Sequence, residues 1–142
     1  MLTWTTYSSW LQGDKRGWVK DGEIYRANKA LFEANKNSQR QGAVILSKIH
    51  IEKVKDEIFE SVKSLKQHIY ALAVCKSHVH LLVSNIDKPI HIVCGYYKAR
   101  TTKLLKKFGV NSRAWSRGFD KRYCYDKKDV SRRIGYIKKH YN

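Results

Sequence analysis

The pair His78 and His80 has the spacing of two metal ligands on one β-strand. The residues around the pair are apolar, with Val79 between the two histidines and Leu81 after them. Residues i and i+2 of a strand point to the same side, with side-chain origins roughly 6–7 Å apart, so both imidazoles can grip one cation. A His-x-His pair in isolation is more often a surface or structural feature. The pair therefore indicates a metal site only if other ligand or catalytic groups accompany it.

Tyr136 and His140 supply that combination near the end of the chain. They are four residues apart, which places them on one face of a helix with about 6 Å between their Cβ atoms. A tyrosine hydroxyl is a nucleophile, and a third imidazole would complete a metal site. The plain alternative is that Tyr136 is a core aromatic beside Ile137. Tyr141 and Tyr125 also remain possible nucleophiles.

The cysteines indicate neither a disulfide framework nor a zinc ribbon. There are three of them, Cys75, Cys94 and Cys124, and no Cys-x-x-Cys motif. A zinc site from Cys75, His78 and His80 is the minor alternative, since no second Cys or His pair has zinc-site spacing. The N-terminus has no signal-peptide pattern, and no stretch is long and apolar enough to span a bilayer. We therefore expect a soluble protein in the reducing cytoplasm of a prokaryote.

The elements that must position these residues follow from hydrophobic periodicity. Strands are predicted at Leu2–Tyr7, at 69–74 and 78–84 as a hairpin, and as a short final strand between Trp115 and Tyr125. Helices are predicted from Ile51 to Leu65, from Pro89 to Gly109, and from Val130 to the end. This order predicts an α+β protein with a ferredoxin-like (split βαβ) antiparallel sheet, helices on it and a C-terminal helix carrying Tyr136.

The length of 142 residues with 42% apolar residues predicts one domain, residues 1–142. The segment around residues 12–45 is unlike the rest, because Gln12 to Gln41 is polar and rich in glycine. This composition predicts an insertion with a short helix around Ala27–Asn35. Its role does not follow from the sequence.

The charge predicts a polyanionic partner. Lys plus Arg total 29 against 12 Asp plus Glu, which gives +17, and the charges recur from Lys15 to Lys139. Nucleic acid fits best, since phosphate neutralisation releases counterions, and DNA and RNA fit equally. An anionic membrane surface is the weaker alternative. Candidate contacts are Lys98, Arg100, Lys103, Lys106 and Lys107 on one helix, Trp115, Arg117 and Arg122 before the last helix, and Arg16 in a basic turn. A solvated helix face and a core role for Trp115 are the alternative interpretations.

Four segments together resemble a known family. They are TWTTYSSWLQGDKRGW (3–18), SHVHLLVS (77–84), WSRGFDKRYCYDKKD (115–129) and YIKKH (136–140). The chain is similar to the HUH endonucleases, and within them to the single-tyrosine transposases of insertion sequences and of the REP-associated branch. That branch usually continues its tyrosine motif as Tyr-Ile-x-x-Asn-Pro. Here His140 and Tyr141 stand in place of the Asn and Pro.

The resemblance implies a metal-dependent enzyme that nicks and rejoins single-stranded DNA at hairpin-forming repeats. Tyr136 would be the nucleophile, forming a 5′-phosphotyrosine, and His78, His80 and His140 would hold Mg²⁺ or Mn²⁺. It also implies a homodimer, in which the tyrosine helix acts in cis or in trans. The alternative is a non-catalytic module that binds DNA or RNA hairpins. A two-histidine phosphoesterase is disfavoured because the chain has no His-x-Thr/Ser motif.

Overall fold

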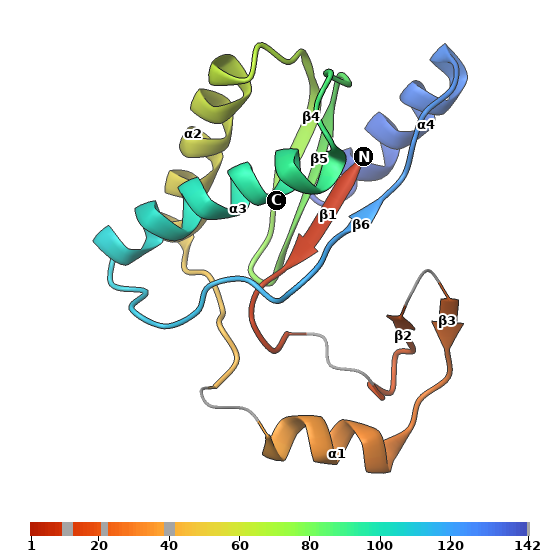
Figure 1. Cartoon of the computed structure of the whole chain (residues 1–142), viewed down its shortest axis with the longest axis vertical. Helices are drawn as coiled ribbons and strands as arrows, with labels where there is room; N and C mark the ends of the chain where they lie inside the picture. The colour runs from red at the N-terminus through yellow and green to blue at the C-terminus, as the bar shows by residue number, and fades with distance from the viewer. Residues whose placement is uncertain (10–12, 21–22, 39–41, 142) are drawn as a thin grey trace.

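The computed structural model describes residues 1–9, 13–20, 23–38 and 42–141. In this part of the chain the fold is α+β, with a four-stranded antiparallel sheet, a two-stranded ribbon and four helices (Figure 1). The strands are β1 (Leu2–Thr5), β2 (Trp18–Lys20), β3 (Glu23–Tyr25), β4 (Ile69–Val74), β5 (His78–Val83) and β6 (Asp120–Lys121). The helices are α1 (Lys29–Asn37), α2 (Lys48–Ser64), α3 (Ile90–Lys107) and α4 (Lys127–Lys138). The predicted α+β class is confirmed.

The main sheet has the order β4-β5-β1-β6, and all neighbouring strands are antiparallel. Strands β4 and β5 form the hairpin that the alternating apolar pattern predicts. Strand β1 lies between β5 and β6, so the first strand of the chain is an inner strand of the sheet. The register places opposite each other Leu72 and Leu81, Val74 and Val79, Thr3 and His80, and Thr3 and Asp120.

Helices α2 and α3 cover one face of the sheet and enclose the larger core (Figure 1). Trp4 is buried at its centre, stacked on Tyr97 with 6.3 Å between ring centroids and edge-on to Trp115 at 6.1 Å. Val54 and Ile58 of α2, four residues apart on one helical face, pack into the same core. Aromatic and branched side chains thus fill this side of the sheet.

Helix α4 packs on the opposite face, against β4 and β5. Its Ile137 is fully buried among Ala71, Ala73 and Leu82 of these strands. The two alanines let the helix approach the sheet closely, because their side chains are small. Val130 and Ile134 flank this contact. The helix expected to carry the tyrosine is therefore held on the face of the sheet that α2 and α3 leave uncovered.

Two terminal elements differ from their predicted bounds. Helix α4 begins at Lys127 rather than Val130, because Asp126 caps it by accepting a hydrogen bond from Asp129 N at 2.7 Å. The final strand is short, Asp120–Lys121, although residues 115 to 125 are rich in aromatic side chains. Gly118 interrupts that stretch with a positive φ of 77°.

The polar insertion contains the ribbon β2–β3 and helix α1. The expected helix at Ala27–Asn35 is observed at Lys29–Asn37, where Asn28 caps it. The ribbon is not evident from the sequence pattern. The predicted bounds Gln12 and Gln41 lie outside the described residues.

Candidate active site

Three imidazoles converge on the α4 side of the sheet. His78 and His80 come from β5, and His140 follows the last turn of α4. Their potential ligand nitrogens all lie within 4.8 Å of one another. Ring centroids are 4.8 Å apart for His78 and His80, 5.5 Å for His78 and His140, and 4.5 Å for His80 and His140. The cluster could hold one metal ion, which agrees with the ligand set expected from the sequence.

Local structure explains why the rings meet. His78 and His80 share one side of β5, while the intervening Val79 faces the larger core. The cross-strand neighbour of His80 on β4 is Ala73, whose methyl group leaves space above the sheet. Burial of Ile137 fixes the end of α4 over this space, and His140 lies three residues further on.

Each imidazole uses its Nδ1 atom in a hydrogen bond with a neighbour. His80 Nδ1 lies 2.8 Å from the Thr3 hydroxyl, and His78 Nδ1 lies 3.3 Å from the Ser77 hydroxyl. His140 Nδ1 lies 3.1 Å from the carbonyl oxygen of Tyr136. A carbonyl only accepts, so His140 donates through Nδ1 and keeps the Nε2 lone pair free. This is how metal-binding histidines are usually oriented by their surroundings.

The histidines of β5 are disfavoured in their charged form. Burial, followed by the neighbouring His78 and His140, lowers the pKa of His80 to about 4. Burial and His140 likewise lower the pKa of His78. His80 is only 5% exposed. Both rings are therefore neutral near pH 7, which is the state that binds a cation.

Tyr136 lies beside this cluster and is open to solvent. Its ring centroid is 5.3 Å from that of His80 and 5.0 Å from that of His140, and 42% of the residue is exposed. The alternative that Tyr136 is a core aromatic does not hold, since Ile137 takes the buried position. Tyr125 precedes α4 at its far end, roughly 16 Å away by helical rise. Tyr141 is half exposed just after His140.

Cys75 does not belong to the three-histidine cluster. Its thiol donates to the carbonyl oxygen of His140 at 3.8 Å, and burial raises the pKa of the thiol. A raised pKa favours the thiol over the thiolate that metals bind. Within the described residues, the group that could hold a metal consists of the three histidines.

The predicted contacts of α3 lie away from this cluster, because α3 covers the other face of the sheet. Lys98 Nζ donates to the carbonyls of Ser116 at 2.7 Å and Gly118 at 2.8 Å. Arg100 forms an ion pair of 2.6 Å with Glu57 of α2. These two side chains therefore have structural partners. The remaining three, Lys103, Lys106 and Lys107, are exposed.

The other predicted contacts are dispersed. Trp115 is buried in the larger core and donates through Nε1 to the Thr101 hydroxyl at 2.9 Å, so it is a core residue. Arg117 is exposed in the loop before β6. Arg122 follows β6 and pairs with Asp120 at 3.1 Å.

Arg16 closes a turn in the polar insertion. It pairs with Asp14 at 2.6 Å and donates to the carbonyl of Ser9 at 2.9 Å. This hydrogen bonding lowers the pKa of Asp14 to about 2. The guanidinium therefore holds the turn together.

Two features of the site do not emerge from sequence reasoning. Thr3 orients His80, but the pairing of β1 with β5 connects residues far apart in the chain, and local patterns do not report it. The basic residues of α4 are the second feature: Arg132, Arg133 and Lys139 lie within one helical turn of Tyr136 in the chain. Their doublets are visible in the sequence as Lys127-Lys128, Arg132-Arg133 and Lys138-Lys139.

No family model matches the chain, and no curated protein shows significant similarity to it. In the described part of the chain, none of the helices combines the length and the apolar character that a membrane crossing requires.

Proposed function

We propose that this protein is a metal-dependent endonuclease and strand transferase for single-stranded DNA, of the HUH single-tyrosine transposase type. The observation that carries the proposal is the contact of the exposed Tyr136 ring with His80 and His140 of the three-histidine cluster. A nucleophile beside a potential metal site is the minimum that such a reaction needs.

The fold supports this assignment. Strands β1 and β4 are both antiparallel to β5, which lies between them, and α2 connects them. Strands β5 and β6 have the same relation to β1, with α3 as their connection. Two interleaved βαβ units of this kind form the ferredoxin-like arrangement that we propose for this chain. Helix α4 is the addition that carries the nucleophile.

The donor set suits a divalent transition metal. His78, His80 and His140 would hold it through their Nε2 atoms, because Nδ1 is engaged in each ring. A bound Mn²⁺ or Mg²⁺ would polarise the scissile phosphate and stabilise the charge that develops on it. Three imidazoles favour Mn²⁺ over Mg²⁺, which prefers oxygen ligands.

The chain's own residues account for the covalent steps. The phenol oxygen of Tyr136 attacks the phosphorus, and the bond from phosphorus to the 3′ oxygen breaks. The phenol gives up its proton, and the released 3′ oxygen takes one up, leaving a 5′-phosphotyrosine and a 3′-hydroxyl. One ester replaces another, so a second 3′-hydroxyl can reverse the reaction and join strands without ATP. The exposure of Tyr136 gives a DNA strand access to it.

We assign unpaired DNA, next to hairpin-forming repeats, as the substrate, and the cytosol as the location. The net charge of +17 supports a nucleic-acid partner. We also infer a homodimer, on the resemblance to the single-tyrosine transposases. The meeting of Tyr136 and the three histidines within one chain supports action of the tyrosine in cis.

The test is formation of a covalent adduct that survives SDS. Wild-type protein is incubated with labelled single-stranded oligonucleotides carrying the repeats that flank its gene, with Mn²⁺ or with EDTA. We expect an adduct with Mn²⁺ that is lost with EDTA, in His78→Ala and in Tyr136→Phe. Tyr141→Phe, which changes an exposed tyrosine five residues further along the chain, should retain it.

Two outcomes would overturn the assignment. An adduct that persists in Tyr136→Phe would move the nucleophile to another residue. Absence of any adduct, together with hairpin binding that survives EDTA and His80→Ala, would identify a non-catalytic binding module instead.

A further inference from the structure

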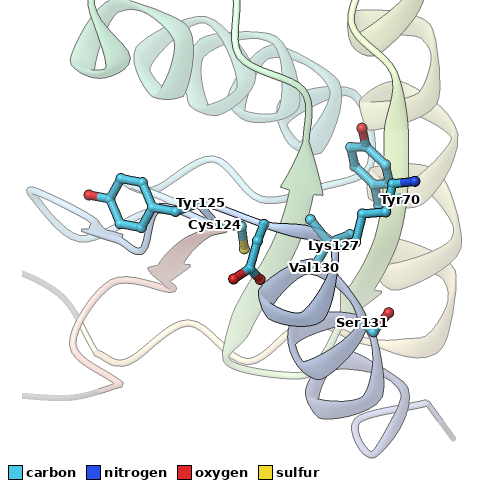
Figure 2. A pocket seen from close by; sticks show the side chains of 7 residues that line it. Tyr70, Cys124, Tyr125, Lys127, Val130 and Ser131 are labelled. Carbon is cyan, nitrogen blue, oxygen red and sulfur yellow. The ribbon is translucent and has the colours of Figure 1, made fainter.

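Two adjoining hollows lie at the beginning of α4, away from the histidines. They share Tyr70, Cys124 and Val130 as lining residues. Figure 2 shows the hollow that Tyr125 and Lys127 also line. We call the part lined by the following six residues the tyrosine groove: Tyr70, Arg122, Tyr123, Cys124, Tyr125 and Lys127. It runs from the end of β6 to the outer side of β4.

The tyrosine groove exposes large aromatic rings. Tyr125 is 86% exposed, Tyr123 47% and Tyr70 43%. Figure 2 shows the rings of Tyr70 and Tyr125 on opposite sides of the hollow, with Cys124 between them. Exposed aromatic rings at a concave surface favour a partner with flat apolar faces, and nucleobases have such faces.

The charge of the groove narrows the kind of partner that it fits. Lys127 and Arg122 line the groove, and Lys121 lies beside them. The carboxylate of Asp126 also lines it, but one of its oxygens accepts from the backbone of Asp129 and caps α4. Arg122 pairs with Asp120, so three cationic side chains stand against two carboxylates and the charge is positive by one. Stacking surfaces combined with cationic side chains are typical of sites for unpaired nucleic acid.

Helix α4 connects the groove to Tyr136. Tyr125 and Tyr136 are eleven residues apart, roughly 16 Å along the helix axis. The backbone N–H of Tyr125 donates to the Asp129 carboxylate at 3.3 Å, and Asp129 lies on the same helical face as Tyr136, so this bond holds Tyr125 at the start of that face. At about 3.4 Å per stacked nucleotide, about five nucleotides bridge this distance.

We propose that the tyrosine groove binds the unpaired DNA strand next to the cleavage site, with bases stacked on Tyr70 and Tyr125 and phosphates held by Lys127 and Arg122. This inference rests on the proposed function and identifies where its substrate lies. Stacking is largely independent of base identity. The groove therefore positions the strand, and hairpin recognition takes place elsewhere.

The test is binding of fluorescein-labelled oligo(dT) of about 12 nucleotides, a length within the usual site size, in EDTA so that no cleavage occurs. We expect Tyr70→Ala and Tyr125→Ala each to weaken binding by about 5-fold or more, the effect of losing one stacked base. Tyr70→Phe and Tyr125→Phe should bind like wild type, because phenylalanine also stacks. Phe59→Ala is the matched control, since Phe59 is 45% exposed on α2 across the sheet.

A second measurement gives position. Oligonucleotides with 5-iododeoxyuridine about five nucleotides from the cleavage site are irradiated, and we expect crosslinks at Tyr70 or Tyr125. Three outcomes would each overturn the inference. They are unchanged affinity in both alanine variants, an equal loss of affinity in Phe59→Ala, and stronger binding of oligo(rU) than of oligo(dT). Adducts with unchanged groove affinity would refute the groove and leave the proposed function intact. Binding that depends on the groove, without any adduct, would refute the proposed nuclease function and leave the groove as a binding site.

Discussion

At the scale of single residues, the site depends on hydrogen bonds that orient the imidazoles. The sequence predicts that His78 and His80 share a side of a strand and that His140 lies one turn after Tyr136, and the structure brings all three rings together. Strand and helix periods are local properties, so sequence alone reveals them. Thr3 could not be predicted, because only the pairing of β1 with β5 brings its hydroxyl to His80.

The lowered pKa of His80 predicts a pH-dependent stability of the metal-free protein. His80 binds a proton below about pH 6.5 in the unfolded chain but only below about pH 4 in the folded protein. The contribution of His80 to the free energy of unfolding should thus be complete above pH 7 and fall by about 2 kcal/mol between pH 6.5 and 4.5. Urea denaturation in EDTA at a series of pH values measures this.

The control is His80→Gln, which cannot titrate at this position and should make the dependence shallower, leaving the part that comes from the lowered pKa of His78. The carboxyl of Asp14 does not contribute in this range, since its pKa of about 2 confines its loss of stabilisation to lower pH. An unchanged slope in His80→Gln would mean that other groups are responsible.

At the scale of elements, the position of α4 decides whether Tyr136 and His140 reach the histidines of β5, as the proposed chemistry requires. Helix α4 meets the sheet through a small apolar contact around Ile137, whereas α2 and α3 share the larger core. The sequence predicts each of these helices, because apolar residues recur on one face. It does not predict which face of the sheet each helix covers, since both faces of β4 carry apolar residues and the face of β5 with His78 and His80 also carries Leu82.

Removal of the N-terminal cap should destabilise the protein more at α4 than at α1. We expect Asp126→Ala to lower the free energy of unfolding by about 1 kcal/mol, because the N-terminal donors of α4 lose their acceptor and α4 is part of the packed structure. Asn28→Ala removes the same kind of cap from α1, which has no buried residue, and should change the global value by a few tenths of a kcal/mol at most. Urea denaturation checks both.

Equal destabilisation by Asp126→Ala and Asn28→Ala would contradict this difference. It would mean that α1 unfolds together with the main sheet.

At the scale of the whole molecule, positive charge lies on both sides of the sheet. The exposed lysines of α3, Lys103, Lys106 and Lys107, are separated from Tyr136 by the sheet itself. Composition predicts a polyanionic partner, but it does not predict this division, because the net charge does not say on which surface each charged residue lies. Residues that appear equivalent in the sequence therefore belong to two different surfaces.

We expect the triple variant Lys103→Gln, Lys106→Gln, Lys107→Gln to cleave short unpaired oligonucleotides at the wild-type rate. Its affinity for long hairpin DNA should fall, and the salt dependence should become shallower by about 0.9 in log–log slope for each DNA phosphate that a lysine no longer neutralises. Anisotropy at several salt concentrations measures this. The matched variant Lys127→Gln, Lys128→Gln on α4 should instead weaken binding of the short oligonucleotides.

Loss of short-oligonucleotide cleavage in the α3 variant would show that the two surfaces are not independent. One continuous DNA path around the sheet would then replace the division into two.

The bond between His140 Nδ1 and the Tyr136 carbonyl has a mechanical consequence. It ties the proposed nucleophile and one proposed metal ligand into a single helical turn, which Ile137 seats on the sheet. A displacement of α4 would carry both away from His78 and His80 at once. If Tyr136 carries a DNA strand as we propose, the same displacement would remove the strand and separate the three histidines, so cleavage would stop while the strand is moved.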